Sequence, residues 1–264
     1  MKKELEVFRT VESRLKRNEE KKKKLIQLLI EDRYIFFSNI AILFCYKNPK
    51  FQSTVIRSFL SQLVISGDIN IHVMKRKIAN KLIKIELYYL TDLGLTRNLP
   101  DTADISKYRF SSANLPLEGL AHRLESQRAM ITLMNLGCRV QRISFNVEEC
   151  DYKTLKKYPD FLFEKDGVKF AVEYERTLKK EKMYHKNAGL HLTEIKLRKW
   201  NKVVYIFAKE TARNCVRTYF ERITEVQIED EVATIKSETL FSRFIFLTVD
   251  ELEKWAKENH CKNN

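Results

Sequence analysis

The sequence predicts a mixed α/β protein of two domains, and three observations support this expectation. The chain has 264 residues, 44% hydrophobic and 32% charged, the composition of a globular protein with a packed core. Four prolines and six glycines leave little room for long flexible segments. Helical and strand-like periodicities alternate along the chain, and a segment with two prolines, residues 98–116, interrupts them. We therefore expect domains at 1–97 and 117–264, joined by a linker at 98–116.

The positive charge is concentrated near the N-terminus. The formal net charge is +14, and the first 100 residues carry 20 lysines and arginines against 10 acidic residues. The remaining residues carry 29 against 25. Because such a charge attracts polyanions, we expect DNA as the partner of the N-terminal domain, with a membrane surface as the alternative.

The sequence predicts a cytoplasmic protein without membrane insertion. The longest apolar stretch, Tyr34 to Tyr46, is shorter than the roughly 20 residues that a membrane span requires. The N-terminal residues are charged and contain no apolar core of a secretory signal. Five scattered cysteines without a C-x-x-C pair are expected to be free thiols.

The N-terminal domain is predicted to contain three helices followed by two strands, the order of a winged helix-turn-helix domain. The expected elements are a helix ending near Asp32, a short helix from Ser38 to Phe44, a helix from Lys50 to Ile65, and strands at 68–73 and 83–90. The segment 88–94 resembles the strand that closes the wing. Residues 74–82 between the strands would form a basic wing.

The third predicted helix has a polar face suited to DNA. A solvated helix face is the alternative interpretation, and the basic wing behind the helix favours DNA. Arg57→Ala is accordingly expected to weaken DNA binding and flatten its salt dependence. The expected DNA-binding residues are Lys50, Ser53, Thr54 and Arg57 on the helix and Lys75, Arg76 and Lys77 on the wing. The expected packing residues of the helix are Val55, Phe59, Leu60, Leu63 and Val64.

The C-terminal domain is predicted to be an α/β layer structure with a mixed sheet. An Asp166-Gly167 pair between two strand-like runs is a strong signal for a β-hairpin. The other expected elements are helices at 117–136, 177–197, 211–223 and 250–259, and strands at 138–145, 202–208 and 243–249.

The hairpin places acidic residues together. A two-residue turn at Asp166-Gly167 pairs residues whose numbers sum to 333, which sets Asp160 opposite Glu173. Glu175 shares their face of the sheet because side chains alternate along a strand. Like charges directly opposite each other are destabilising, and a divalent cation would relieve them. We therefore expect an Mg²⁺ or Mn²⁺ site suited to cleaving phosphodiesters. A solvated acidic strand edge is the alternative.

These residues resemble the core of the PD-(D/E)xK nucleases, through Pro159-Asp160 followed by Glu173-Tyr174-Glu175. That family has a lysine at the position of Glu175. The resemblance therefore implies a displaced lysine, for which Lys179 is the candidate and Lys180 the second choice. It implies catalytic roles for Asp160, Glu173, Glu175 and Lys179, and metal ligation by Glu125, Asp160 and Glu173. His122, one helical turn before Glu125, is a possible auxiliary residue, although a core histidine is the alternative.

The order of elements resembles the replication-relaxation family and the MobC-type plasmid mobilization relaxases. The resemblance rests on a winged helix, the helix carrying His122, Pro-Asp and Glu-x-Glu-x-Thr. It implies a metal-dependent endonuclease that binds double-stranded DNA and nicks a plasmid origin of transfer, with accessory mobilization and coupling proteins and a homodimer as further expectations. His185 and His191 have no H-x-H partner, which argues against the tyrosine relaxases.

Two alternatives remain open. The first is a non-catalytic replication initiator or DNA-binding regulator with a degenerate nuclease-like domain, which Glu175 in the lysine position favours. The second is a restriction-type or transposition endonuclease that makes double-strand cuts as a dimer.

Overall fold

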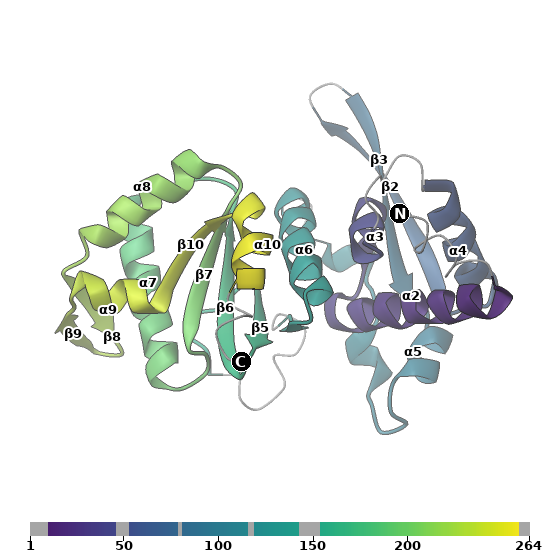
Figure 1. Ribbon diagram of the computed structural model, residues 1–264, viewed down its shortest axis with the longest axis horizontal. Helices are drawn as coiled ribbons and strands as arrows, with labels where there is room; N and C mark the ends of the chain where they lie inside the picture. The colour runs from purple at the N-terminus through teal and green to yellow at the C-terminus, as the bar shows by residue number, and fades with distance from the viewer. Residues whose placement is uncertain (1–9, 46–52, 79–80, 116–118, 143–153, 259–264) are drawn as a thin grey trace. The chain divides into compact units, whose positions relative to one another are not determined.

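The chain divides into two compact units, residues 1–120 and 121–264 (Figure 1). The computed structural model describes residues 10–45, 53–78, 81–115, 119–142 and 154–258. Both units combine helices and strands, which confirms the predicted mixed α/β class. No helix in these ranges is long and apolar enough to cross a membrane.

The first unit contains four helices, three strands and two short 3-10 helices within its described residues. They are α2 (Val11–Asp32), β1 (Ile35–Phe36), α3 (Phe37–Leu43), α4 (Ser53–Ile65), β2 (Ile69–Ile78), β3 (Lys81–Leu90), α5 (Asp92–Asn98), η1 (Ile105–Tyr108) and η2 (Ser112–Asn114). The segment 88–94 was expected to be a strand that closes the wing, but only its first three residues belong to β3, which ends at Leu90. Helix α5 follows at once, and the Thr91 hydroxyl caps it by accepting the Gly94 N–H.

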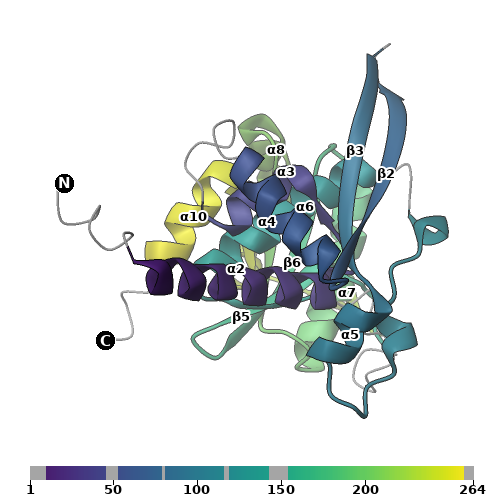
Figure 2. The same cartoon turned by 90° about the vertical axis from the view of Figure 1, so that its right-hand side faces the viewer.

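The sheet of the first unit has the order β1-β3-β2, and its strands are antiparallel. The β2–β3 ladder runs from Ile69 opposite Leu90 to Ile78 opposite Lys81. Strand β1 pairs with β3 only at Tyr88 and Leu87. The distal part of β2 and β3 is therefore a two-stranded hairpin that extends beyond the sheet (Figure 2).

The core of the first unit is formed by apolar stripes of α2 and α4 against the sheet. Leu25, Leu28 and Leu29 of α2 are buried. The buried residues of α4 are Ile56, Leu60 and Leu63. The predicted packing face of α4 was therefore partly wrong, because Val55 and Val64 are 54% and 37% exposed. Ile56, Leu60 and Leu63 form one stripe at helical spacing, and Val55 lies outside it.

The segment expected to be a linker packs against the first unit. The Phe110 ring stacks on Tyr89 of β3, with centroids 4.5 Å apart, and also contacts His72 of β2. The Arg109 guanidinium donates two hydrogen bonds to Asp92 of α5, at 2.8 and 2.7 Å. Residues 105–110 are therefore held by aromatic and ionic contacts.

The second unit contains one central sheet, a small hairpin and five helices within its described residues. They are α6 (Leu120–Asn135, with Leu120 in the first unit), β4 (Arg139–Gln141), β5 (Phe161–Lys165), β6 (Val168–Glu175), α7 (Glu181–Lys196), β7 (Lys202–Phe207), α8 (Glu210–Glu221), β8 (Glu225–Ile228), β9 (Glu231–Thr234), α9 (Ser237–Arg243), β10 (Phe244–Thr248) and α10 (Val249–Glu258). The sequence did not predict β8, β9 or α9.

The central sheet is of mixed orientation, as expected. Its order is β10-β7-β6-β5-β4, with β4, β5 and β6 antiparallel and β6, β7 and β10 parallel. The predicted hairpin register is confirmed, since Phe161 lies opposite Val172 and Lys165 opposite Val168. Asp166 and Gly167 both have positive φ, 51° and 74°, as a tight hairpin turn requires.

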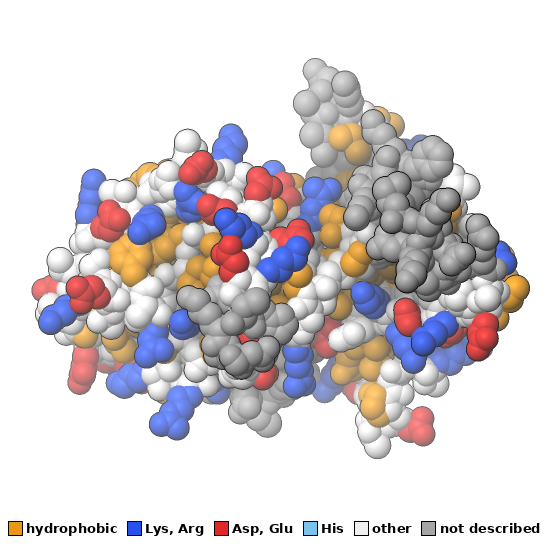
Figure 3. Space-filling view, viewed as in Figure 1, with side chains coloured by type: hydrophobic (Ala, Val, Ile, Leu, Met, Phe, Trp, Pro, Cys, Tyr) orange, Lys and Arg blue, Asp and Glu red, His pale blue; other side chains and the backbone are white. Residues whose placement is uncertain are grey.

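Helices cover both faces of this sheet. Helices α7, α8 and α9 lie on one face, and α6 and α10 on the other (Figure 1). The larger core lies under α7 and α8 and includes Tyr184, Trp200, Tyr205 and Phe220. At the unit's surface, acidic and basic side chains are interspersed (Figure 3).

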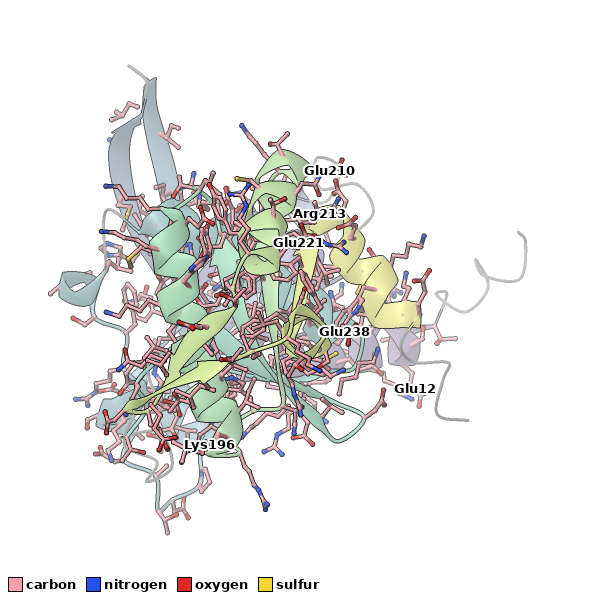
Figure 4. The ribbon with its side chains drawn as sticks, turned by 90° about the vertical axis from the view of Figure 1, so that its left-hand side faces the viewer. Glu12, Lys196, Glu210, Arg213, Glu221 and Glu238 are labelled. Atoms are coloured by element: carbon pink, nitrogen blue, oxygen red, sulfur yellow. The ribbon has the colours of Figure 1, made fainter. Side chains whose placement is uncertain are left out.

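Ion pairs also connect the outer helices of the second unit. Arg213 of α8 donates a hydrogen bond to Glu210 on its own helix (Figure 4). It also donates one to Glu251 of α10.

Candidate functional site

The acidic residues selected from the sequence gather where β5 begins and β6 ends. Asp160 directly precedes β5, and Glu173 and Glu175 lie in the last three positions of β6. Because the two strands are antiparallel, these positions meet at one end of the hairpin. The other candidates come from two neighbouring segments, His122 and Glu125 from α6 and Lys179 and Lys180 from the residues before α7. Helix α7 begins at Glu181, so the two lysines are not part of it, contrary to the prediction.

Asp160 leaves the regular ladder between β5 and β6. Its N–H still donates to the Val172 carbonyl at 2.9 Å. Its own carbonyl, however, accepts a hydrogen bond from Arg142 at 3.0 Å. The Tyr174 N–H donates to the Asp160 carboxylate at 2.7 Å, and His122 Nε2 lies 2.8 Å from the other carboxylate oxygen. Four contacts therefore fix the position of this acid.

Asp160 and His122 form an ion pair. Burial by itself would raise the pKa of Asp160, but the hydrogen bond and the charge of His122 outweigh it and the pKa is lowered. The same hydrogen bond raises the pKa of His122 above 6.5. The contact therefore favours a carboxylate and an imidazolium.

Glu173 is held from two sides. Lys157 Nζ, from the segment before β5, lies 2.7 Å from Glu173 Oε1. His191 Nε2, from α7, lies 3.2 Å from the same oxygen. His191 is fully buried, and Lys157 is 17% exposed. The Glu173 side chain thus lies on the face of the sheet that α7 covers. Its other basic neighbour, Lys157, is partly exposed to solvent.

Glu175 is buried and pairs with the predicted lysine. Lys179 Nζ donates to Glu175 Oε1 at 2.7 Å. Burial raises the pKa of Glu175, Lys179 opposes this, and the negative charges of Glu173 and Asp160 raise it further. Glu175 therefore lies within the electrostatic reach of both other carboxylates.

Glu125 lies apart from Glu173 and Glu175. Its carboxylate accepts a hydrogen bond from Arg176 Nε at 3.0 Å. It also interacts with Tyr174, whose pKa is raised to about 12, chiefly by burial and next by the Glu125 charge. The Tyr174 ring contacts His122 of α6. Glu125 is thus on the α6 side, opposite the side that Glu173 contacts.

The sequence predicted that a cation would be needed to neutralise the opposed Asp160 and Glu173 carboxylates. The structure shows basic side chains next to them instead. Asp160 contacts His122, Glu173 contacts Lys157 and His191, and Glu175 contacts Lys179. The expectation considered the hairpin alone, where Asp160 and Glu173 have only each other. In the folded unit, basic side chains from other segments neutralise these acids separately.

A divalent cation would find oxygen ligands here but not a preformed cage. Among the described residues, no three histidine, cysteine or acidic side chains are arranged to hold a metal ion. Mg²⁺, however, is commonly held by one or two carboxylates, with waters and substrate phosphates completing its coordination. The charge of Asp160 contributes to the raised pKa of Glu175, so these two acids are the candidates for such a pair. An ion held by them would need its remaining ligands from water or a bound molecule.

Three contact residues of the site were not selected from the sequence. They are Lys157, Arg142 and His191. Lys157 stands three residues before Asp160, which was an available signal. Arg142 and His191 come from distant segments, and no local pattern connects them to the hairpin.

The predicted DNA-binding residues have different environments. Thr54 and Lys75 are exposed and Ser53 is half-buried. Lys50 and the side chains of Arg76 and Lys77 lie outside the part of the chain that the structure describes.

Arg57 is anchored within the first unit. Its guanidinium donates to Glu86 of β3 at 2.9 Å and lies 4.2 Å from the centre of the Phe37 ring. It is half exposed and connects α4 to β3 and α3.

The chain matches no protein-family model, no curated protein and no solved structure. Its function must therefore be argued from its own residues.

Arg57→Ala is expected to destabilise the first unit by about 1 kcal/mol, because it removes a half-exposed ion pair and a cation–π contact. Urea unfolding of the full chain would measure the change. Arg57→Lys, which keeps the charge but not the planar group, should lose less. An unchanged unfolding midpoint for Arg57→Ala would show that these contacts contribute no stability.

Proposed function

We propose that the protein is a metal-dependent DNA endonuclease that nicks double-stranded DNA, with the first unit binding the DNA and the second cutting it. One observation carries the proposal. The buried Glu173 and Glu175 and the half-buried Asp160 lie at the junction of β5 and β6, each contacts a lysine or a histidine, and the charges of Glu173 and Asp160 raise the pKa of Glu175.

Such an arrangement is costly for the fold. Burying an ion pair removes two charges from water, and apolar residues of similar size often stabilise a protein equally well or better. Glu173 and Glu175 lie on strands whose neighbouring positions are apolar and well packed. Groups with perturbed pKa values and specific charge partners are concentrated in functional sites. The cluster is therefore better explained by chemistry than by stability.

The chain's own residues have distinct tasks in this proposal. His122 and the Tyr174 N–H orient Asp160. Asp160 and Glu175 would hold Mg²⁺ or Mn²⁺, which when bound supplies polarisation of the scissile phosphate and activation of the attacking oxygen. Lys179 contacts Glu175 and is 42% exposed. It is therefore placed to balance the negative charge that develops on the phosphate.

The first unit supports DNA binding through its topology and charge. Helix, short strand, two helices and a long hairpin follow one another in the order expected of a winged helix domain. On the exposed face of α4 lie Thr54, Ser58, Ser61 and Gln62, small polar side chains suited to base edges. The hairpin exposes Lys75 and Lys84, which lie opposite each other across the strands.

The motif resemblance supports a narrower role. It suggests a plasmid mobilization relaxase that nicks an origin of transfer, together with accessory mobilization and coupling proteins and as a homodimer. These partners rest on the resemblance alone.

A non-catalytic DNA-binding protein is the second candidate, either a replication initiator or a regulator. One observation favours it. Every acid of the predicted site, including Glu125, already has a basic partner, so the cluster is electrically satisfied without a metal ion.

Supercoiled plasmid carrying candidate origin sequences tests the proposal. The full chain with Mg²⁺ or Mn²⁺ should convert it to the open circular form, and a chelator should prevent this. Linear product would instead favour the double-strand endonuclease. DNA binding without any cleavage, across both metals and a range of origins, would favour the non-catalytic candidate.

Lys75→Ala is expected to weaken DNA binding and to reduce the slope of log affinity against log salt by about 0.9, the value for one lost phosphate contact. Fluorescence anisotropy with labelled duplex at several salt concentrations would measure it. Lys254→Ala is the matched control, because Lys254 is an exposed lysine on α10 of the other unit. Equal slopes for Lys75→Ala and the unaltered chain would remove the hairpin from the DNA interface.

A further inference from the structure

His191 is a buried histidine to which the proposed reaction assigns no task. It lies on α7, fully buried, within the larger core of the second unit. The rings of Trp200, Tyr205 and Phe244 surround it, with centroids 5.6, 6.3 and 6.3 Å away. A position between three aromatic rings would ordinarily be filled by an apolar side chain.

The polar atoms around His191 lack regular partners. Within the described residues, both ring nitrogens of His191, Tyr205 Oη and Trp200 Nε1 are buried and make no regular hydrogen bond, and Glu173 Oε1 has only its ion-pair contacts with Lys157 and His191. Buried polar atoms are nearly always hydrogen-bonded, so each exception requires an explanation. Glu173 and Tyr205 are neighbours across β6 and β7. The Trp200 and Tyr205 rings both contact His191, so these polar atoms lie around His191 and its Glu173 partner.

His191 approaches the Glu173 carboxylate from the core side and can donate a hydrogen bond to it. Its Nε2 is 3.2 Å from Glu173 Oε1, a separation at the edge of the hydrogen-bond range, and the tautomer protonated at Nε2 presents a donor to this oxygen. Lys157 reaches the same oxygen from the partly exposed side. Lys157 can move toward an incoming phosphate, whereas His191 is enclosed by the core and cannot leave.

We propose that His191 is a positioning residue for Glu173. The imidazole of His191 donates a hydrogen bond to the Glu173 carboxylate and holds it in place when Lys157 turns to the DNA backbone. The proposal rests on the endonuclease function proposed above, in which the motif resemblance gives Glu173 a catalytic role. His191 acts through Glu173 and touches neither metal nor DNA. Outer-shell partners that orient the ligands of a metal site typically affect activity by about 10–100-fold, and we expect a loss of the same order here.

Two substitutions of His191 separate positioning from packing. His191→Gln keeps an N–H donor near the position of Nε2 but loses the ring, and His191→Phe keeps the ring but loses the donor. If His191 positions Glu173, the plasmid nicking rate of His191→Phe falls by about 10–100-fold, while that of His191→Gln stays within a few-fold of the unaltered chain. Nicking by His191→Phe at the unaltered rate, or equal losses in both variants, would overturn the proposal.

A double-mutant cycle supplies a measurement that does not depend on activity. Urea unfolding midpoints are compared for His191→Phe in the natural background and in a Glu173→Met background, which removes the carboxylate. A larger loss of stability in the natural background is the expected result, because only there does His191→Phe remove one of the two basic partners of a buried carboxylate and leave Lys157 as the other. Equal losses in the two backgrounds mean that His191 only packs, which overturns the proposal.

The two experiments also separate this proposal from the function on which it rests. An unaltered chain that never nicks DNA contradicts the endonuclease function, whatever the cycle shows. A chain that nicks, with a cycle that shows no coupling, contradicts the role of His191 alone.

Discussion

Asp160→Asn is expected to reduce metal-dependent nicking by about a thousandfold, which corresponds to roughly 4 kcal/mol of transition-state stabilisation. The substitution removes a negative charge but keeps an oxygen that can accept the Tyr174 N–H, so the start of β5 should keep its place. The rate of conversion of supercoiled to open circular plasmid would measure the effect. DNA affinity should change little, because the substitution leaves the contacts proposed for α4 and the hairpin of the first unit unaltered.

The same hairpin offers a matched control. Asp166→Asn makes the same change of charge at the opposite end of β5, in the turn. Asp166 has φ of 51°, a conformation that asparagine also tolerates. Asp166→Asn should therefore nick DNA normally. Equal cleavage by the unaltered chain and Asp160→Asn would show that Asp160 has no part in the reaction, and the non-catalytic candidate would then be preferred.

The hairpin shows how much of the site can be predicted from local sequence. Asp166 and Gly167 set the turn, the turn sets the register, and the register places Glu173 and Glu175 on one face. Each step depends on residues near one another in the chain. The prediction failed for Asp160, because its direction is set by His122 on α6 and not by its strand neighbours.

The neighbours of the acids could not be predicted in the same way. Lys157 and Lys179 reach Glu173 and Glu175 from the segments before β5 and before α7, and His191 reaches Glu173 from α7. Pairing of this kind depends on how α7 packs against the sheet. A charge balance calculated on the hairpin alone therefore overestimates the need for a metal ion.

Helix α2 shows a different limit. It begins at Val11, with the Thr10 hydroxyl accepting the Ser13 N–H. Its first half is largely exposed and contains charged residues without an apolar stripe, so periodicity indicates a helix only near Leu25. Lysine, arginine and glutamate are good helix formers. Their intrinsic helix propensity therefore favours a helix in this exposed segment, although its hydrophobic periodicity does not indicate one.

Asp68→Ala is expected to destabilise the first unit by about 2–3 kcal/mol. The carboxylate is 1% exposed and accepts hydrogen bonds from Lys22 of α2 at 2.8 Å, Arg97 of α5 at 2.8 Å and Ser66 at 2.9 Å. The substitution removes the group that connects these elements. The loss should stay below that of a fully buried ion pair, because Lys22 and Arg97 are partly exposed and can return to water. Urea unfolding of the full chain would measure it.

The pH dependence of this contribution gives a second test. Burial alone would raise the pKa of Asp68, but the hydrogen bonds from Lys22, Arg97 and Ser66 outweigh it, so the folded pKa lies below 3.8. A carboxyl group with a lowered folded pKa stabilises the protein fully above its unfolded pKa, and this stabilisation is lost as the pH falls through the folded value. The stability difference between the unaltered chain and Asp68→Ala should therefore be constant near neutral pH and shrink below about pH 4. A difference that instead grows as the pH falls would mean that Asp68 is protonated in the folded unit and that the network is not ionic.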